Sequence, residues 1–387
     1  MAGPGIPDTG EGLTAGWLRE ALVAGGRADC PPVRELRCEA IGEGVGLMAE
    51  ILRCEVTFAA DDRPSESVVV KLASDRPRNR KLGRRWRLYR REFTFYRDLA
   101  PASPLRAPAL LYGDFDARTH RFVLVLEDLG HLTAADQVRG ATPEQARRAV
   151  KEVAGLHGKY WGRVEPLPAD FHAMLAPRVR SALQIAYLLS LPRNLSLLSG
   201  PWPAEVRDLA EEYGLRLVDH LDQLVEEPLT FVHGDYRLDN MFFDGDGLTV
   251  VDWQNSAIAN GLYDVAYFLA GSVSPEIRRA VEREALLEYH DIVCGLGARE
   301  FPFERCWRLY RETLLGCLVL PVVLAGWLEE RQGRQLELRD AIATRTATAL
   351  RDLDAGALLP EVPPFASRAG LRHALCRAGY RAYRAFA

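Results

Sequence analysis

The chain has 387 residues, enough for two lobes that each bury a core, and its apolar and charged fractions are those of an ordinary globular protein. Its formal net charge is −4, so the molecule as a whole has no electrostatic reason to bind nucleic acid. Residues 1–12 lack the apolar core of a signal peptide, and the longest apolar run, 314–328, is too short to cross a bilayer. We therefore expect a cytoplasmic protein that binds neither nucleic acid nor a membrane.

The seven cysteines are widely scattered and form neither a Cys-x-x-Cys pair nor a metal-ligand spacing. In a reducing cytoplasm this pattern predicts free thiols. Lysine is scarce, with only Lys71, Lys81, Lys151 and Lys159 against a large excess of arginine. A lysine inside an apolar segment is therefore a candidate functional group.

Glycines mark the turn between the first two predicted strands, 33–41 and 50–58. Gly42, Gly44 and Gly46 would allow backbone N–H groups to approach phosphate oxygens, although a glycine-rich hairpin is often only a turn. The spacing departs from Gly-x-Gly-x-x-Gly, because a leucine stands where the third glycine is expected. The choice between ATP and GTP is therefore open.

A lysine and a glutamate on neighbouring predicted elements form a candidate ion pair. The predicted buried strand 67–72 carries Lys71, and a lysine is seldom buried without a partner. The predicted helix 85–99 places Glu92 inside its apolar stripe, where a carboxylate is costly unless it is paired. A Lys71–Glu92 pair would meet both needs and hold Lys71 against the α- and β-phosphates of a nucleotide. The alternative is that Lys71 extends from a strand edge and Glu92 lies at the border of the stripe.

Nine lysines or arginines stand between residues 76 and 91. This stretch is either a solvated loop and helix face or an attractor for an anionic ligand. A non-enzymatic adaptor that uses this stretch is one of the alternative functions.

Strands predominate early in the chain and helices late, which predicts an α+β protein with two lobes. The apolar strand 122–126 runs into Glu127-Asp128-Leu129-Gly130, the expected link between an N-lobe, 1–128, and a C-lobe, 129–387. The predicted helices cover 13–24, 142–161, 177–191 (stopped by Pro192), 201–227, 282–293, 303–328 and the basic tail 368–384. The acids Glu205, Asp208, Glu211 and Glu212 form a solvated face or attract a cationic acceptor, and the tail packs on the C-lobe or contacts a partner.

The stretch 231–253, FVHGDYRLDNMFFDGDGLTVVDW, concentrates the oxygen ligands that phosphoryl transfer requires. Asp235 and Asn240 flank one tight loop, and a predicted hairpin then brings Asp252 back toward Asn240. One carboxylate must receive the proton of the acceptor hydroxyl, while a second carboxylate and an amide oxygen hold Mg²⁺. The competing interpretation is a solvated hairpin that carries acids by chance.

His-Gly-Asp at 233–235, the asparagine five residues after that aspartate and Asp-Trp-Gln at 252–254 resemble the aminoglycoside phosphotransferase and choline kinase superfamily. Asp-Trp-Gln, the linker 127–129 and the Leu-His…Tyr-Trp segment 156–161 are most similar to its ecdysteroid kinase-like branch. The resemblance covers most of the chain and implies a bilobal protein-kinase-like fold.

The resemblance also implies roles for individual residues. It makes Asp235 the catalytic base and Asn240 and Asp252 the Mg²⁺ ligands, and it places the adenine ring against backbone groups from Leu126 to Asp128.

Other residues near the motif have expected structural roles. Asp264 is expected to cap the following helix, and the resemblance adds a role in bracing the catalytic loop. His233 is expected to orient that loop, and His157 to be a packed, hydrogen-bonded histidine. Arg237 lies near the transferred phosphate or pairs with an acid.

Together these features predict an ATP- and Mg²⁺-dependent phosphotransferase, a monomer or weak dimer, that acts on a hydroxyl group of a small molecule. A nucleotide-binding pseudokinase is a further alternative. Steroid-like alcohols, aminoglycosides, choline-like amino alcohols and natural-product intermediates all remain possible acceptors, and the apolar C-lobe helices favour a bulky, partly apolar alcohol.

Overall fold

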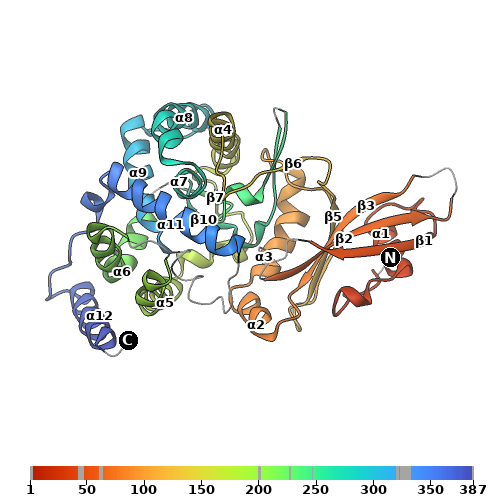
Figure 1. Ribbon diagram of the computed structural model, residues 1–387, viewed down its shortest axis with the longest axis horizontal. Helices are drawn as coiled ribbons and strands as arrows, with labels where there is room; N and C mark the ends of the chain where they lie inside the picture. The colour runs from red at the N-terminus through yellow and green to blue at the C-terminus, as the bar shows by residue number, and fades with distance from the viewer. Residues whose placement is uncertain are drawn as a thin grey trace. The chain divides into compact units, whose positions relative to one another are not determined.

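The structure is a computed structural model that describes residues 3–41, 48–60, 64–198, 202–225, 228–245, 247–319, 322 and 333–385. The chain divides into two compact units: Met1–Ala134 with Met241–Ser256, and Ala135–Asn240 with Ala257–Ala387. Strands predominate in the first unit and helices in the second, as expected for the α+β class (Figure 1). The predicted boundary between the lobes falls once, after residue 128, whereas the first unit also takes in the later segment Met241–Ser256.

An antiparallel five-stranded sheet forms the centre of the first unit (Figure 1). In spatial order its strands are β1 (Val33–Ala40), β2 (Ala49–Phe58), β3 (Glu66–Ala73), β5 (Phe122–Glu127) and β4 (Leu110–Phe115). Buried side chains of β2, β3 and β5 share one apolar core with Leu18 and Leu22 of helix α1 (Ala15–Ala24). The sheet therefore holds β3, the strand that carries Lys71, between two neighbours.

The helices of the first unit agree with the prediction in part: one helix lies within the predicted range 13–24, whereas the helix predicted at 85–99 begins only at Leu88. Thr14 accepts a hydrogen bond from the backbone N–H of Trp17 and so caps α1. Helix α2 (Pro77–Arg85) presents exposed basic side chains, and α3 (Leu88–Thr94) continues as a π-helical turn, η2 (Phe95–Leu99). Short 3-10 turns, η1 (Gly10–Gly12) and η3 (Ala100–Ala102), complete the unit.

The prediction that all seven cysteines are free thiols is wrong. Cys38 of β1 and Cys54 of β2 form a disulfide, and the two residues are direct partners in the strand register with Cα atoms 4.1 Å apart. Sixteen residues separate them in the sequence, and only the register of the hairpin brings them together. The other five cysteines, all among the described residues, take part in no disulfide.

A second, three-stranded sheet contains the predicted catalytic hairpin. Its order is β6 (Thr133–Ala134), β8 (Met241–Asp244) and β9 (Gly247–Val250), with Met241 opposite Val250. The predicted hairpin is therefore present. Its end leads into Asp252 and the 3-10 helix η6 (Trp253–Asn255).

Helices form most of the second unit: α4 (Pro143–Tyr160), α5 (Pro177–Ser196), α6 (Ala204–Leu224), α7 (Leu262–Ser272), α8 (Pro275–Gly295), α9 (Phe303–Gly316), α11 (Arg334–Asp352) and α12 (Arg368–Arg384). Helix α4 packs along α8, α5 along α6, and α7 against both α9 and α11 (Figure 1). The 3-10 turns η4 (Ala169–Leu175), η5 (Leu238–Asn240) and η7 (Ala355–Leu358) connect them. Most of the apolar run 314–328 lies outside the described residues.

The start of α4 agrees with the sequence prediction, and the end of α5 does not. The start of α4 is confirmed: Thr142 accepts from the backbone N–H of Gln145, and the Gln145 side chain accepts from that of Thr142. The prediction that Pro192 stops α5 is wrong, because the helix continues to Ser196. Tertiary packing outweighs the lost backbone hydrogen bond, since Leu188 and Leu191 are buried on a helix that packs along α6.

The basic tail packs on the second unit as helix α12, beside α5 and α6 (Figure 1). Arg377 pairs with Glu212 at 2.8 Å, and Arg384 pairs with Glu211 at 2.5 Å. These two acids of α6 therefore hold the tail. Within the described residues, no helix has both the length and the apolar character needed to cross a membrane.

A two-stranded antiparallel ribbon precedes the catalytic loop. Strand β7 (Leu229–Val232) pairs with β10 (Ala257–Asn260), and α7 begins directly after β10. The end of β7 and the first turn of α7 are joined by a hydrogen bond from the backbone N–H of His233, the residue that follows β7, to the carboxylate of Asp264.

Candidate active site

A buried ion cluster in the first unit joins Lys71 to two carboxylates. Lys71 Nζ lies 2.7 Å from Glu92 Oε1 and 2.8 Å from Asp252 Oδ1. The side chains of Lys71 and Glu92 are 7% and 1% exposed, whereas that of Asp252 is 24% exposed. The structure thus pairs Lys71 with Glu92, as the sequence suggests, and adds Asp252 as a second partner. Of the three groups, Asp252 is the most accessible to a ligand.

Burial disfavours the charged form of both groups of the pair. The groups differ in whether the attraction of their partners outweighs burial. Burial alone lowers the pKa of Lys71, but the attraction of Asp252 and Glu92 outweighs it, and the net shift is upward. Lys71 therefore stays cationic at neutral pH. Burial raises the pKa of Glu92 to about 7, against the opposing attraction of Lys71. The charge on Glu92 thus depends on its lysine partner.

Local packing fixes the position of Asp252. Its backbone is left-handed, with φ 66° and ψ 59°, a conformation that aspartate adopts more readily than most residues. The next residue, Trp253, is fully buried and stacks on Phe95 with ring centroids 3.7 Å apart. Gln254 Nε2 donates to Asp252 Oδ2 at 3.2 Å, so both carboxylate oxygens of Asp252 are engaged.

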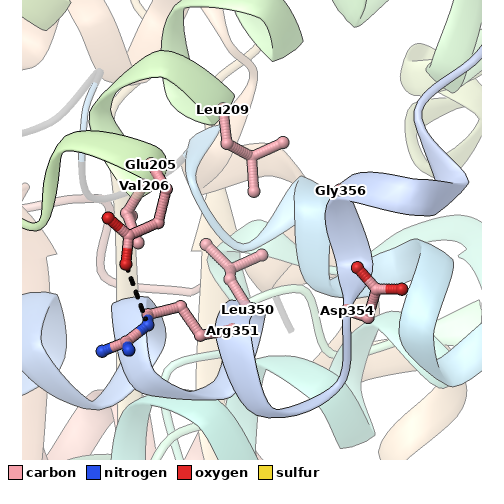
Figure 2. Close-up of a pocket in the computed structure, with 7 residues that line it drawn as sticks. All are labelled: Glu205, Val206, Leu209, Leu350, Arg351, Asp354 and Gly356. Atoms are coloured by element: carbon pink, nitrogen blue, oxygen red, sulfur yellow. Dashed lines mark ion pairs between the residues drawn. The ribbon is translucent and has the colours of Figure 1, made fainter.

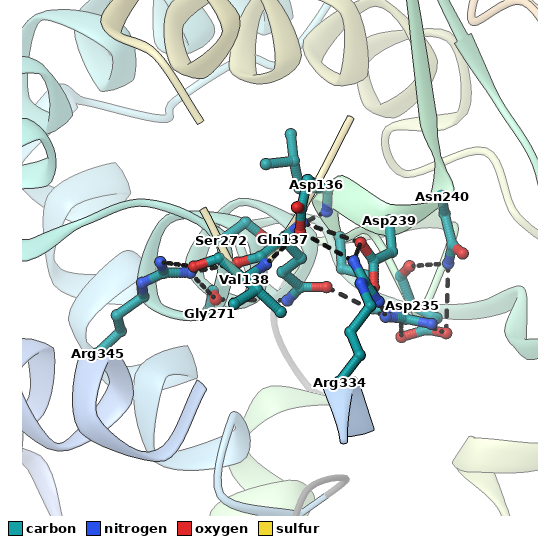
Figure 3. Close-up of polar contacts among 12 residues, drawn as sticks. Asp136, Gln137, Val138, Asp235, Asp239, Asn240, Gly271, Ser272, Arg334 and Arg345 are labelled. Carbon is teal, nitrogen blue, oxygen red and sulfur yellow. Dashed lines mark hydrogen bonds and ion pairs between the residues drawn. The ribbon is translucent and has the colours of Figure 1, made fainter. Parts of the chain in front are cut away.

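In the second unit, the loop after β7 brings Asp235 and Asn240 together (Figure 3). Asn240 Nδ2 donates to the backbone oxygen of Asp235 at 2.9 Å and lies 3.4 Å from Asp235 Oδ2. Because the amide nitrogen faces Asp235, the amide oxygen of Asn240 is left to accept or to ligate. Arg237 Nε lies 3.4 Å from Asp235 Oδ2, so an arginine also faces the predicted base.

Asp264 braces this loop from helix α7. Its carboxylate accepts the backbone N–H of His233 at 2.7 Å and that of Gly234 at 2.9 Å. His157 Nε2, 3.3 Å away, donates to the same carboxylate, while His157 Nδ1 lies 3.0 Å from the hydroxyl of Tyr289. The expected bracing role of Asp264 and the packed, hydrogen-bonded state of His157 are therefore both present.

The expected helix-capping role of Asp264 is wrong. Gly261 stands at the N-cap position of α7, and Asp264 stands three positions later, inside the first turn. Its carboxylate instead accepts from two loop N–H groups, one buried and one partly buried, which would otherwise lack an acceptor in the protein. His233 has the expected orienting role, since its Nδ1 accepts the backbone N–H of Asp235 at 3.2 Å.

Sequence reasoning missed Tyr267, a buried tyrosine of α7 whose phenol interacts with the Asp235 carboxylate. Burial, followed by the charge of Asp235, raises the pKa of Tyr267 well above its ordinary value, so the phenol stays protonated. The available signal was spacing: Tyr267 lies three residues after Asp264, on the same face of α7.

The comparisons with known proteins identify the family. The model of the ecdysteroid kinase-like family matches residues 43–294, well over half of the chain. The chain belongs to this family. The resemblance noted in the sequence is thereby confirmed at the family level. No curated protein matches the chain in sequence.

Solved structures place this member of the ecdysteroid kinase-like family in a known fold. An ethanolamine kinase from Plasmodium vivax covers 88% of this chain and 89% of its own, with 11% identity and a TM-score of 0.52. A choline kinase from Cryptosporidium parvum Iowa II covers 84% and 92%, with 13% identity and a TM-score of 0.51. A Ralstonia eutropha JMP134 protein described as an aminoglycoside phosphotransferase covers 88% and 99%, with 14% identity and a TM-score of 0.50. At these identities the likeness establishes the fold, the predicted bilobal kinase-like one.

The remaining predicted nucleotide contacts are the glycine turn and the linker residues Leu126 and Asp128. Gly42, Gly44 and Gly46 lie outside the described residues. Leu126 is buried in β5, next to the linker. The carboxylate of Asp128 is occupied by Arg53, by Ser67 at 2.6 Å and by the backbone N–H of Gly130 at 2.9 Å. Burial opposes the ionised form of Asp128, but these donors outweigh it and hold the pKa of the carboxyl below its ordinary value. Its side chain therefore ties the linker to β2 and β3.

Among the described residues, no group of three His, Cys, Asp or Glu side chains is arranged to hold a metal ion. The predicted ligands, Asn240 and Asp252, supply one amide oxygen and one carboxylate. Mg²⁺ is commonly held by one or two protein carboxylates together with substrate phosphates and water, so this donor set suits a metal that arrives with a nucleotide.

A surface pocket lies apart from these residues. It has a volume of about 330 Å³ and lies between α6, α11 and η7 (Figure 2). Its lining consists of Glu205, Val206, Leu209, Leu350, Arg351, Asp354 and Gly356. Glu205 and Arg351 pair at 3.2 Å on its edge. None of the predicted site residues lines it, so we assign it no part in the site.

Proposed function

We propose that this member of the ecdysteroid kinase-like family is an ATP- and Mg²⁺-dependent phosphotransferase that phosphorylates a hydroxyl group of a small organic molecule. The observation that carries the proposal is the buried Lys71 ammonium, held at 2.7 Å by Glu92 and at 2.8 Å by Asp252. A buried lysine oriented by a helical glutamate is the arrangement that grips nucleotide phosphates in kinases.

Asp235 is the proposed base. As the acceptor oxygen bonds to the γ-phosphorus, its proton passes to the Asp235 carboxylate and ADP leaves with the electron pair of the broken P–O bond. Arg237, Asn240 and Tyr267 all face this carboxylate, which supports a fixed orientation for proton transfer.

Asn240 and Asp252 are the proposed metal ligands. Bound Mg²⁺ supplies positive charge that offsets the charge of the nucleotide phosphates. When a metal is bound, Asp252 would share its carboxylate between the metal and Lys71, whereas Glu92 would continue to hold Lys71. The greater exposure of Asp252 supports this division of roles.

Nucleotide binding is proposed for Lys71, the turn at Gly42, Gly44 and Gly46, and the backbone from Leu126 to Asp128. ATP is the proposed donor, and competition between ATP and GTP tests the choice. The acceptor is an alcohol of low molecular mass: similar folds belong to proteins named for ethanolamine, choline and aminoglycosides. The proposed setting is the cytoplasm, and the proposed state is a monomer or weak dimer.

The substitution Asp235→Asn tests the proposal. Turnover should fall about 10²- to 10⁴-fold, the usual contribution of a general acid–base group, while calorimetry still detects MgATP binding. Asp291→Asn is a matched control, because the Asp291 side chain is 82% exposed. Wild-type turnover in Asp235→Asn would refute the assignment. MgATP binding with no phosphorylated product from any alcohol would indicate a pseudokinase, and absence of MgATP binding would favour an adaptor.

A further inference from the structure

Helix α11 sends an arginine from its first position to the catalytic loop (Figure 3). A positive charge is electrostatically unfavourable at a helix N-terminus, so helix stability does not explain why an arginine stands at position 334. Its Nη2 donates to Asp239 Oδ1 at 2.8 Å, and its Nη1 donates to Asp239 Oδ2 at 3.2 Å. Nη2 also donates to Asp136 Oδ1 at 2.9 Å. The two parallel contacts with Asp239 form the geometry in which arginine holds a carboxylate most firmly.

Asp239 in turn lies between two arginines. Its side chain is 5% exposed, and its Oδ2 is 3.3 Å from Arg237 Nη1. The Arg237 guanidinium also donates to Gln137 Oε1 at 3.1 Å and approaches Asp235 at 3.4 Å. One arginine therefore serves both Asp239 and the proposed base.

We infer that Arg334 is a positioning residue for Asp235, an inference that rests on the proposed phosphotransfer. By neutralising Asp239, Arg334 leaves Arg237 to hold the Asp235 carboxylate. Without Arg334, the carboxylates of Asp239 and Asp235 compete for the single guanidinium of Arg237. Asp239 wins that competition, because its side chain is 5% exposed against 11% for Asp235, and the more deeply buried carboxylate needs its ion partner more.

A second arginine fixes α11 in the place that this role requires. Arg345 follows Arg334 by eleven residues, about three helical turns, and so lies on the same face. It is buried, and it donates to the backbone oxygens of Gln137 at 2.6 Å and Val138 at 2.8 Å (Figure 3). Helix α11 therefore contacts the 136–138 segment through both arginines. These contacts fix the position from which Arg334 reaches Asp239.

The substitution Arg334→Gln tests the inference. The assay follows MgATP turnover, first with water as acceptor and then with any alcohol that the wild-type protein phosphorylates. We expect kcat to fall about tenfold while KM for MgATP stays within about twofold, because the change displaces the base and touches no nucleotide contact. Arg351→Gln is the matched control: it lies on the same helix, and its guanidinium pairs with Glu205 outside this network.

A double substitution separates positioning from simple bracing. Asp239→Asn removes the competing carboxylate, so Arg334→Gln/Asp239→Asn should recover kcat to within about threefold of wild type. If Arg334 only braced the fold, the double variant would be at least as slow as Arg334→Gln. Wild-type kcat in Arg334→Gln, or a double variant no faster than Arg334→Gln, would overturn the inference.

A measurement without turnover keeps this inference distinct from the proposed function. The Nε–Hε NMR cross-peak of Arg237, assigned by its loss in Arg237→Lys, reports the contact with Asp235. It should shift in Arg334→Gln and return in the double variant. If the wild-type protein turns over no MgATP, the proposed function fails, and this cross-peak still decides whether Arg334 positions Arg237. An unchanged cross-peak in Arg334→Gln would refute the inference that Arg334 positions Arg237.

Discussion

The Lys71 cluster of the first unit and the catalytic loop of the second hold their charges in different ways. Lys71 and Glu92 are almost completely buried and meet in one direct contact of 2.7 Å. Asp235 is held by several weaker contacts, including two of 3.4 Å from Arg237 and Asn240. The backbone around it is fixed instead by Asp264, through two N–H groups of the loop.

The difference follows from what each region is proposed to contact. A lysine that grips phosphates can be fully desolvated, provided that a buried carboxylate neutralises it. A base that receives a proton must stay accessible to its substrate, so rigidity has to come from the loop behind it. Stability should therefore depend most on the first region, and turnover on the second.

The largest expected effect on stability comes from Lys71→Met. This change leaves Glu92 buried without its cation, and breaking such a pair costs about 3–5 kcal/mol at pH 8. The pKa of Glu92 in the folded protein, about 7, already exceeds the ordinary value of 4.5. Between these pH values the folded chain binds more protons than the unfolded chain, so the Glu92 contribution to stability falls as the pH rises. Loss of Lys71 removes the attraction that opposes burial, so the pKa of Glu92 rises further. The pH range over which stability falls then extends to higher pH.

Urea unfolding at pH 5 and pH 8 measures the effect. The destabilisation of Lys71→Met should be several-fold smaller at pH 5, where Glu92 is protonated at low cost. Lys151→Met is the control, because Lys151 is half exposed and pairs with Glu288 on the surface. Equal destabilisation at both pH values would contradict the interpretation of Glu92.

Asp264→Asn should have a smaller effect on stability and a larger one on turnover. An amide accepts at only one oxygen, so one of the two loop N–H groups loses its partner, at a cost of about 1–3 kcal/mol. Displacement of the loop should lower kcat about 10²-fold, because proton transfer tolerates little misplacement. Unfolding curves and steady-state kinetics together test this, with Asp291→Asn as control. A loss of about 1–3 kcal/mol in stability without a change in kcat would argue against the bracing role.

Tyr267→Phe should have the smallest effect. It removes only the hydroxyl group that interacts with Asp235, so stability should change by about 1 kcal/mol or less. We expect kcat to fall about threefold with unchanged KM for MgATP, since the other donors still orient the carboxylate. Steady-state kinetics decide the matter, and a loss as large as that of Asp235→Asn would make Tyr267 a catalytic residue.

Local features of the site were predictable from the sequence. The hairpin after Asn240, the strand that carries Lys71 and the helical stripe that contains Glu92 all follow from side-chain periodicity, which each segment carries by itself. The pairing of Lys71 with Glu92 was predictable for a related reason, because two buried opposite charges on neighbouring elements each require a partner.

Other contacts depended on tertiary structure. Asp252 meets Lys71 across 181 residues of sequence, and Arg334 meets Asp239 across 95. The Cys38–Cys54 disulfide depends on strand register, and the passage of α5 through Pro192 depends on packing against α6. Residue type and spacing determine which groups need partners. Which partners they meet depends on how the whole core packs, and no single segment of the sequence determines that packing.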